Sequence, residues 1–336
     1  MKKKVAIIGC GAILRRHAEA INKNSNFELV SVCDNQRDIL DAAKSKYNVS
    51  GYLDYKTMIA KEDIDLVAIA TPNSSHVEQA KFCINSGKDV LIEKPISLNA
   101  EDVLEIENLA KKNQKNAYCV LQVRLNPSVK LFKDAIDKGL LGNIRGISLV
   151  QRWQRPIEYF TGWRSIPKVG GGTLHECGIH YIDIMQYILG VPKVASASVY
   201  KTKHSHVEIE DTIYSLLDFK DFGGTLEVTI AAEPFNLECS LSVMGSNGYI
   251  KLGGKAMNVI ETYNFLSNGC RVEFENMLES SDIDNKPNSY GSYAGSCPNH
   301  TELYRNLDKF KINNAHASLK IIQDIYECAY ESKGIY

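Results

Sequence analysis

A strand, a glycine turn and a helix follow one another at the start of the chain. The apolar run 5–8 leads into Gly9 and Gly11, and a helix is expected to begin at Leu14. Glycines in such a turn let the backbone approach a pyrophosphate, and the helix offers it unpaired N–H groups and a positive dipole end. The pattern predicts a dinucleotide site in the first unit of a parallel sheet.

An acidic residue, Asp34, ends the second apolar run, about 20 residues after the glycines. A carboxylate there accepts the ribose hydroxyls and repels a 2′-phosphate, which favours NAD over NADP. Leu14 replaces the third glycine of the strict motif, so helix and strand are expected to pack less closely. Two glycines alone could mark an ordinary strand–helix turn, but Asp34 and the strand–helix–strand context argue against that alternative.

The composition of the chain excludes several functional classes. Its 336 residues favour two domains, and 39 basic against 40 acidic residues argue against a nucleic-acid or polybasic membrane surface. No run approaches the roughly 18 apolar residues of a membrane span, and the apolar run that ends at Gly9 is too short for a signal peptide. The nine scattered cysteines lack metal-ligand spacing, so we expect a cytoplasmic protein with reduced thiols and no metal site.

Strands and helices alternate through the first third of the chain. This predicts a doubly wound parallel sheet, a Rossmann domain, over residues 1–122. The expected strands after the first two are 65–71, 89–94 and 117–123, and the helices are 76–86 and 100–112. Ligands of such sheets bind beyond the carboxyl ends of the strands, which here carry Gly9, Asp34, Thr71, Lys94 and Gln122.

Longer strands and turn signals dominate the remainder of the chain. Strands are expected over 209–219, 225–230, 237–244 and 249–252, and helices over 127–138, 173–189 and 315–332. Turns at 222–224 and 246–248 make consecutive hairpins, which predict a C-terminal α+β domain over 123–336 with a large, mostly antiparallel sheet. The polar stretch 267–298 is expected to be a long loop.

The expected strand 213–219 carries apolar side chains on both faces. Ile213 and Leu217 lie on one face, and Tyr214 and Leu216 on the other. A sheet with one solvated face would alternate more cleanly. We therefore expect this face to pair with a second copy of the chain, giving at least a dimer.

Two clusters carry chemistry-bearing residues. Lys94, between Glu93 and Pro95, ends a strand at the cofactor edge, so it is a candidate general base, the alternative being a lysine paired with Glu93. The glycine triplet 170–172 could allow close approach of a ligand. Glu176 and His180, four residues apart, share one face of the expected helix, and an imidazole can bond a sugar hydroxyl or move its proton. The alternative is a helix whose polar face is merely solvated.

Together these residues resemble the Gfo/Idh/MocA family of NAD(P)-dependent sugar oxidoreductases, over essentially the whole chain. The resemblance rests on the motifs above, on Thr71-Pro-Asn73 with His76, and on Trp163-Arg164 and Asp183. It implies a two-domain fold, catalysis by Lys94 and His180 where nicotinamide meets substrate, and subunit contact through the open sheet face, in a tetramer or a dimer. The cofactor residues that it implies are Gly9, Gly11, Ala12, Ile13, Leu14, Asp34, Thr71, Asn73, His76, Glu93, Lys94, Gln122, Trp163 and Arg164.

A narrower resemblance is to the UDP-N-acetylglucosamine and UDP-N-acetylglucosaminuronate 3-dehydrogenases. It rests on the segments 122–127, 151–156, 158–164 and 290–300. Those enzymes form a 3-keto sugar that a pathway aminotransferase converts, in lipid A or surface-glycan synthesis. Arginine forks suit a diphosphate and aromatic faces suit stacking. The implied substrate and catalytic residues are Lys94, Arg124, Asn126, Arg152, Arg155, Tyr159, Arg164, Glu176 and His180.

Glu176 departs from the family pattern, in which many members carry aspartate and the uronate-specific group often carries an amide. A glutamate there would repel a nearby C6 carboxylate, which favours neutral UDP-N-acetylglucosamine. Two alternatives stay open. One is a dehydrogenase of a free sugar or inositol, and the other is a non-catalytic NAD(H)-binding regulator.

Overall fold

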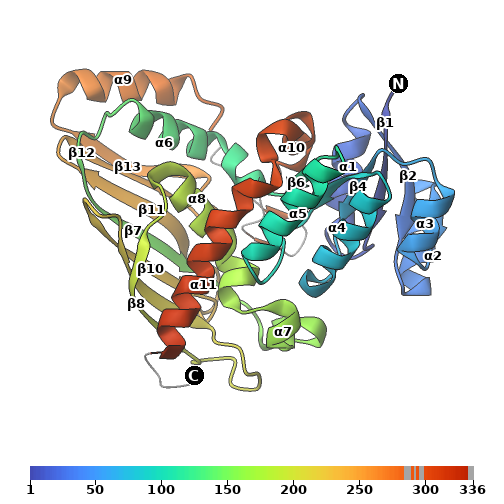
Figure 1. Ribbon diagram of the computed structural model, residues 1–336. Coiled ribbons are helices and arrows are strands. Elements are labelled where there is room, and N and C mark those ends of the chain that lie inside the picture. Colours follow the sequence, from blue (N-terminus) through green and yellow to red (C-terminus); the bar gives the residue numbers. More distant parts are fainter. Residues whose placement is uncertain (284–288, 291–292, 295–298, 332–336) are drawn as a thin grey trace. The chain divides into compact units, whose positions relative to one another are not determined.

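The computed structural model describes residues 1–283, 289–290, 293–294 and 299–331 (Figure 1). The chain forms two compact units, the first from Met1–Leu121 and Asn299–Leu319, the second from Gln122–Pro298 and Lys320–Tyr336. The sequence had suggested that everything beyond residue 122 belongs to the second domain. Residues 299–319 instead join the first unit, because helix α10 (His300–Arg305) packs on helix α1 (Leu14–Asn22).

The first unit contains a six-stranded sheet in which every pair of neighbours is parallel. Its order is β3-β2-β1-β4-β5-β6, with the reversal between β1 and β4 that marks a doubly wound fold. The predicted Rossmann architecture is therefore confirmed. The strands are β1 (Lys3–Ile8), β2 (Phe27–Cys33), β3 (Ser50–Tyr52), β4 (Leu66–Ile69), β5 (Asp89–Ile92) and β6 (Ala117–Cys119).

Local signals explain where the helices of this unit begin and end. Asp54 caps α3 through Thr57 N–H at 2.8 Å, and α4 ends before Gly87, whose φ of +76° suits glycine. The helices after α1 are α2 (Arg37–Tyr47), α3 (Tyr55–Lys61), α4 (His76–Asn85) and α5 (Glu101–Lys112). The returning segment adds α10 and two short 3-10 turns at 307–310 and 312–315.

The second unit is built on a seven-stranded sheet of order β13-β12-β11-β7-β10-β9-β8. Only β7 and β10 run parallel, so the predicted mostly antiparallel sheet is confirmed. The strands are β7 (Ile144–Arg152), β8 (Lys193–Tyr200), β9 (Thr212–Asp218), β10 (Gly223–Thr229), β11 (Glu238–Gly245), β12 (Gly248–Gly253) and β13 (Val259–Phe265). The helices are α6 (Pro127–Asp137), α7 (Pro167–Gly170), α8 (Ile179–Leu189), α9 (Asn268–Glu279) and, from Lys320 onward, α11 (His316–Glu331).

The expected loop over 267–298 is wrong in its first part, which forms helix α9. Ser267 caps this helix at Cys270 N–H, and Phe274 is fully buried against Tyr263 and Phe265, with ring centroids 4.7 and 5.4 Å apart. One aromatic anchor on a polar helix leaves little periodicity to detect. Of the remainder, 289–290 and 293–294 form the short strand pair β14 (Ser289–Tyr290) and β15 (Tyr293–Ala294), and 284–288, 291–292 and 295–298 lie outside the described residues.

One face of the large sheet is buried and the other is partly apolar. Leu217 and Ile213 of β9 are buried, whereas Tyr214 and Leu216 are 46% and 53% exposed. Other exposed apolar residues are Tyr200, Met244 and Tyr249 on β8, β11 and β12. Within the described part of the chain, no helix is long and apolar enough to cross a membrane.

We expect this exposed face to pair with a second copy of the chain. Light scattering at micromolar concentration should give at least twice the chain mass of 37.5 kDa. Leu216→Asp should shift the particle toward the monomer, because it places a charge on the apolar face. Val272→Asp, at an exposed apolar position of α9, is the matched control and should leave the mass unchanged. A wild-type particle of 37.5 kDa would contradict the expectation.

Candidate functional site

Four predicted cofactor residues follow four neighbouring strands of the parallel sheet. Gly9, Asp34, Thr71 and Lys94 come just after β1, β2, β4 and β5. Backbone hydrogen bonds carry the sheet pairing one step beyond the strands, from Gly9 N–H to Cys33 O, from Ala70 N–H to Ile8 O and from Glu93 N–H to Ile69 O, at 2.8–2.9 Å. These residues therefore share the carboxyl edge of the sheet, where doubly wound folds bind nucleotides.

The two glycines of the turn serve different purposes. Gly9 has φ +99°, and a Cβ there would collide with the carbonyl oxygen of Ala70, so the fold itself requires glycine. A Cβ on Gly11 would meet no heavy atom within 4 Å. The exposed backbone at Gly11 and Ala12 is thus open to a ligand such as the pyrophosphate of a dinucleotide.

Asp34 is tied to the glycine turn. Its Oδ2 accepts a hydrogen bond from Cys10 N–H, and its Oδ1 accepts one from Gln36 N–H, both at 2.9 Å. A carboxylate accepts about four hydrogen bonds, so two sites remain for ribose hydroxyls. Beside it, α1 begins after Ile13, which provides no side-chain cap, and Leu14 is buried. The turn, the carboxylate and the helix start therefore suit NAD.

His76, predicted to contact the cofactor, is instead buried between two loops. Its Nδ1 lies 2.8 Å from Pro95 O and its Nε2 lies 2.8 Å from Thr71 O, while burial lowers the pKa of the imidazole. The ring holds together the loops that follow β4 and β5. Asn73 nearby is also buried, and Thr71 donates its hydroxyl to Gln79.

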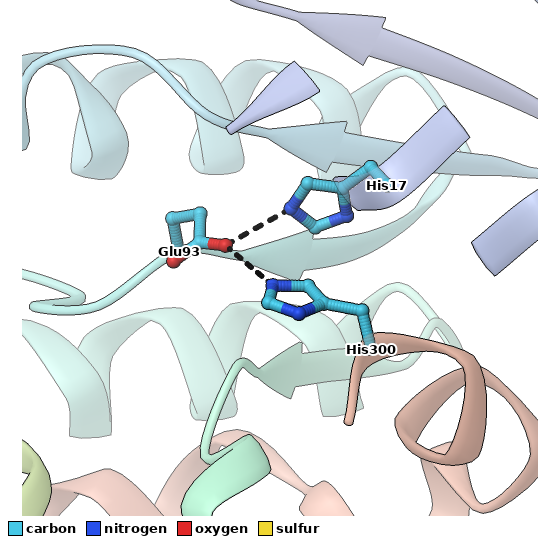
Figure 2. A group of neighbouring side chains, drawn as sticks. All are labelled: His17, Glu93 and His300. Atoms are coloured by element: carbon cyan, nitrogen blue, oxygen red, sulfur yellow. Dashed lines mark hydrogen bonds and ion pairs between the residues drawn. The ribbon is translucent and has the colours of Figure 1, made fainter. Parts of the chain in front are cut away.

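Glu93 likewise faces the interior of the first unit. Its Oε1 lies 3.0 Å from His17 Nε2 and 3.5 Å from His300 Nε2 (Figure 2). Its Oε2 accepts a hydrogen bond from Lys94 N–H at 3.2 Å. The Glu93 side chain, predicted to contact the cofactor, is therefore part of a buried network. Lys94 is half-buried just beyond β5. The sequence did not identify His17 and His300 as partners, because no local spacing relates them.

Two predicted substrate residues of the second unit are committed to internal contacts. The guanidinium of Arg124 donates Nε to Asp183 Oδ2 and Nη2 to Oδ1, at 2.7 and 2.6 Å, and lies 4.3 Å from the Tyr187 ring centroid. Asn126 donates to the carbonyls of Ala256 and Met257. The fork of Arg124 is thus occupied by a carboxylate and is not open to a phosphate. Gln122 is buried in the same 3-10 turn.

Arg152 is also held by carboxylates. It lies on the outer sheet face, where Nε and Nη2 donate to Glu227 at 2.6 Å and Nη1 lies 3.8 Å from Glu238. Of the four arginines predicted to bind a diphosphate, Arg124 and Arg152 are therefore structural. The guanidinium of Arg155 lies 4.6 Å from the ring centroid of Trp153 and 5.5 Å from that of Tyr159.

Tyr159, Arg164 and Glu176 form a polar cluster in the second unit. Arg164 Nε lies 3.2 Å and Tyr159 Oη 3.4 Å from Glu176 Oε2, while the guanidinium stacks on Trp163 at 4.3 Å. Burial, followed by the charges of Cys177 and Glu176, raises the pKa of Tyr159 well above its usual value. The tyrosine therefore stays protonated and can donate a hydrogen bond.

The segment before His180 is not the continuous α-helix that the spacing predicts. Leu174–Gly178 forms a π-helical turn, and α8 starts at Ile179, so the i, i+4 relation between Glu176 and His180 does not hold in its α-helical form. Tyr326 Oη accepts Leu174 N–H at 3.1 Å, and Glu210 Oε1 accepts Thr173 N–H at 2.8 Å. The π turn is thus fixed at its start.

The glycine triplet 170–172 leaves room for the side chains and backbone that pack around the π turn. A Cβ on Gly170 would lie 3.1 Å from Arg164 Cα, and one on Gly172 would collide with Tyr326 Oη and lie 2.6 Å from Glu210 Oε1. Both glycines are therefore explained by packing inside the second unit. The interpretation that they admit a ligand is not needed.

Comparison with known proteins agrees with this geometry. A family model described as "Oxidoreductase family, NAD-binding Rossmann fold" matches residues 3–121, and the "GFO/IDH/MocA C-terminal domain" matches 129–251. The WlbA dehydrogenase from Bordetella pertussis, solved with NADH and UDP-GlcNAcA, is 26% identical, with a TM-score of 0.87 over 98% of this chain and 96% of its own.

Two further relatives show the range of activities. The WlbA dehydrogenase from Chromobacterium violaceum, also solved with NADH and UDP-GlcNAcA, is 27% identical, with a TM-score of 0.86 over 98% of this chain and 94% of its own. The D-glucoside 3-dehydrogenase of Escherichia coli is 25% identical over 66% of this chain and 68% of its own length. The cofactor is common to the solved pair, whereas the sugar differs among relatives.

The two glycines of the cofactor turn should respond differently to alanine. Gly9→Ala should lower the free energy of unfolding by more than about 2 kcal/mol, because φ and the Ala70 carbonyl both oppose a side chain. Gly11→Ala should change it by less than about 0.5 kcal/mol and yet weaken NADH binding about tenfold. Urea unfolding and NADH fluorescence titration measure the two effects. Unchanged NADH affinity in Gly11→Ala would contradict the assigned role.

Asp34 should select NAD over NADP. Asp34→Ala should weaken NAD binding tenfold or more, since a charge-assisted hydrogen bond contributes about 1.5–3 kcal/mol, and should narrow the preference over NADP. Calorimetric titration with both cofactors measures this. Gln36→Ala, which leaves the carboxylate in place, is the control. Equal affinity of the wild-type protein for NAD and NADP would refute the assignment.

Proposed function

Because this chain belongs to the Gfo/Idh/MocA family and is an NAD-dependent sugar oxidoreductase, we propose that it oxidises the C3 hydroxyl of a UDP-linked N-acetylhexosamine. The observation that carries the proposal is the likeness, over 98% of the chain, to two dehydrogenases solved with NADH and UDP-GlcNAcA. The product would be a 3-keto sugar nucleotide. An aminotransferase is the class of enzyme that would convert such a ketone into a 3-amino sugar.

Held at the glycine turn and Asp34, NAD would supply the hydride acceptor for oxidation at C3. Lys94 Nζ takes the proton of the C3 hydroxyl as the general base, and His180, in the first turn of α8, bonds the same hydroxyl and orients it. Arg155 and Arg164 are the arginines that we propose for the diphosphate, and the aromatic faces beside them suit stacking. Arg164 also lies 3.2 Å from the Glu176 carboxylate.

The contacts of Glu176 bear on the choice of sugar. A bare glutamate would repel the C6 carboxylate of a uronate, but Arg164 lies 3.2 Å from this carboxylate and offsets its charge. The electrostatic preference for neutral UDP-N-acetylglucosamine is therefore weaker than the sequence alone suggests. Both the neutral sugar nucleotide and its uronate belong to the proposed substrate class.

A free sugar is the second candidate substrate. It is favoured by the occupied forks of Arg124 and Arg152 and by the likeness to a D-glucoside 3-dehydrogenase. NADH formation, followed by absorbance, tests the two candidates on UDP-N-acetylglucosamine, its uronate, free N-acetylglucosamine, a glucoside and inositol. Turnover of a UDP-sugar without turnover of free sugars supports the proposal, and the reverse pattern overturns it.

The proposed catalytic residues give a direct prediction. Lys94→Ala should lower kcat by about 10²–10⁴-fold while leaving UDP-sugar affinity largely intact. His180→Ala should lower kcat less, because it orients the hydroxyl. Lys81→Ala, a surface change on α4, is the control and should retain wild-type rates. Near-normal rates in Lys94→Ala with an inactive His180→Ala would exchange the two roles.

A further inference from the structure

A buried carboxylate lies between two imidazoles in the first unit (Figure 2). Glu93 follows β5, His17 is in α1 and His300 begins α10. The three side chains are 10%, 0% and 3% exposed. None of them reaches the proposed chemistry directly, yet the carboxylate belongs to the residue immediately before Lys94.

The positions of the protons in this cluster follow from its contacts. Burial alone would raise the pKa of the Glu93 carboxyl, but His17 and His300 hold it well below its usual range, so it is ionised. An ionised carboxylate only accepts hydrogen bonds. Oε1 lies 3.0 Å from His17 Nε2, a hydrogen-bond distance, and 3.5 Å from His300 Nε2. Burial lowers the pKa of His300, which keeps that ring neutral.

The network continues beyond the two imidazoles. His17 Nδ1 lies 2.9 Å from Tyr304 Oη, within hydrogen-bonding distance. At the other end, Glu93 Oε2 accepts from Lys94 N–H at 3.2 Å. The chain of contacts thus runs from α10 through α1 to the backbone of the lysine.

We propose that Glu93, clamped by His17 and His300, is a positioning residue for Lys94, which it serves by fixing the lysine backbone and by keeping a negative charge one residue away. The proposal rests on the proposed role of Lys94 as general base. A rigidly placed base matters because a displacement of about 1 Å can cost about 10²-fold in rate. The held charge stabilises the ammonium that Lys94 becomes once it has taken the hydroxyl proton.

The same three side chains could also be ligands of a divalent cation, since their donor atoms lie within 4.8 Å of one another. The contacts favour the positioning role. Oε1 bonds His17 and lies 3.5 Å from His300 Nε2, and Oε2 accepts from Lys94 N–H, so the buried carboxylate has polar partners without a cation. A bound metal is therefore one outcome of the test.

Other charged and titratable groups also surround Glu93. The charge of Arg16 on α1 contributes to lowering the pKa of His300, and the charge of Glu93 acts to raise the pKa of His76 on α4. Arg16 and His76, with Tyr304 and the two imidazoles, remain in place in Glu93→Gln. That variant keeps the shape, removes the negative charge and replaces one accepting oxygen by an NH2 donor, so a changed titration of Lys94 reports on the loss of the carboxylate.

The decisive measurement does not depend on substrate. Lysines are reductively methylated with ¹³C, and the Lys94 signal is assigned by its loss in Lys94→Arg and titrated by NMR. Glu93→Gln should move its midpoint at least about half a pH unit lower, while NADH affinity stays within about threefold. Glu105→Gln, a surface carboxylate paired with Lys81, should not move it. An unchanged midpoint in a folded, NADH-binding Glu93→Gln overturns the proposal.

Enzyme activity in a His300 variant provides a second test. His300→Gln should lower kcat about 10–100-fold with KM for the UDP-sugar nearly unchanged, and Tyr304→Phe should have a smaller effect. If no UDP-sugar is turned over, the proposed function fails while the NMR titration still decides the positioning role. If Glu93→Gln does not fold, the Lys94 titration in His300→Gln takes its place. Stoichiometric metal in the purified protein that is lost in His300→Gln makes the cluster a metal site and overturns the proposal.

Discussion

The parallel pairing of β1, β2, β4 and β5 is the constraint on which the cofactor side of this protein depends. Parallel strands end at one edge, and here backbone hydrogen bonds extend one step past the strands. The glycine turn, the Asp34 carboxylate and the proposed base are therefore brought together by main-chain geometry. Side chains then refine it: Asp34 ties two of the loops, and His76 ties two others.

Periodic and local features of the sequence were sufficient to predict the architecture. Alternating strands and helices indicated the parallel sheet, and hairpin turns indicated the antiparallel one. Each of these patterns is local, because it involves residues that are close together in the sequence. Helix α9 was not predicted because a single buried aromatic residue, Phe274, anchors an otherwise polar segment. The π turn at Leu174–Gly178 was not predicted because the residues that bond its start, Glu210 and Tyr326, are distant in the sequence.

The sequence predicted where the candidate site residues lie in the fold better than it predicted which side chains they contact. Gly9, Asp34 and Lys94 were placed at the sheet edge from the strand pattern alone. Arg124 and Arg152 were expected to face a diphosphate, but their carboxylate partners, Asp183 and Glu227, could not be paired with them from sequence. Long-range ion pairs leave no periodic trace, so an arginine that binds a ligand and one that braces a core look alike in a sequence.

The return of residues 299–319 to the first unit has a consequence for how this protein can be divided. The chain passes from one unit to the other after residues 121, 298 and 319, so neither unit is a single contiguous stretch. A fragment ending at residue 121 would keep all six strands and yet lack α10, exposing the Glu93 carboxylate to solvent on one side. Recombination at one boundary would therefore not transfer a complete nucleotide-binding module.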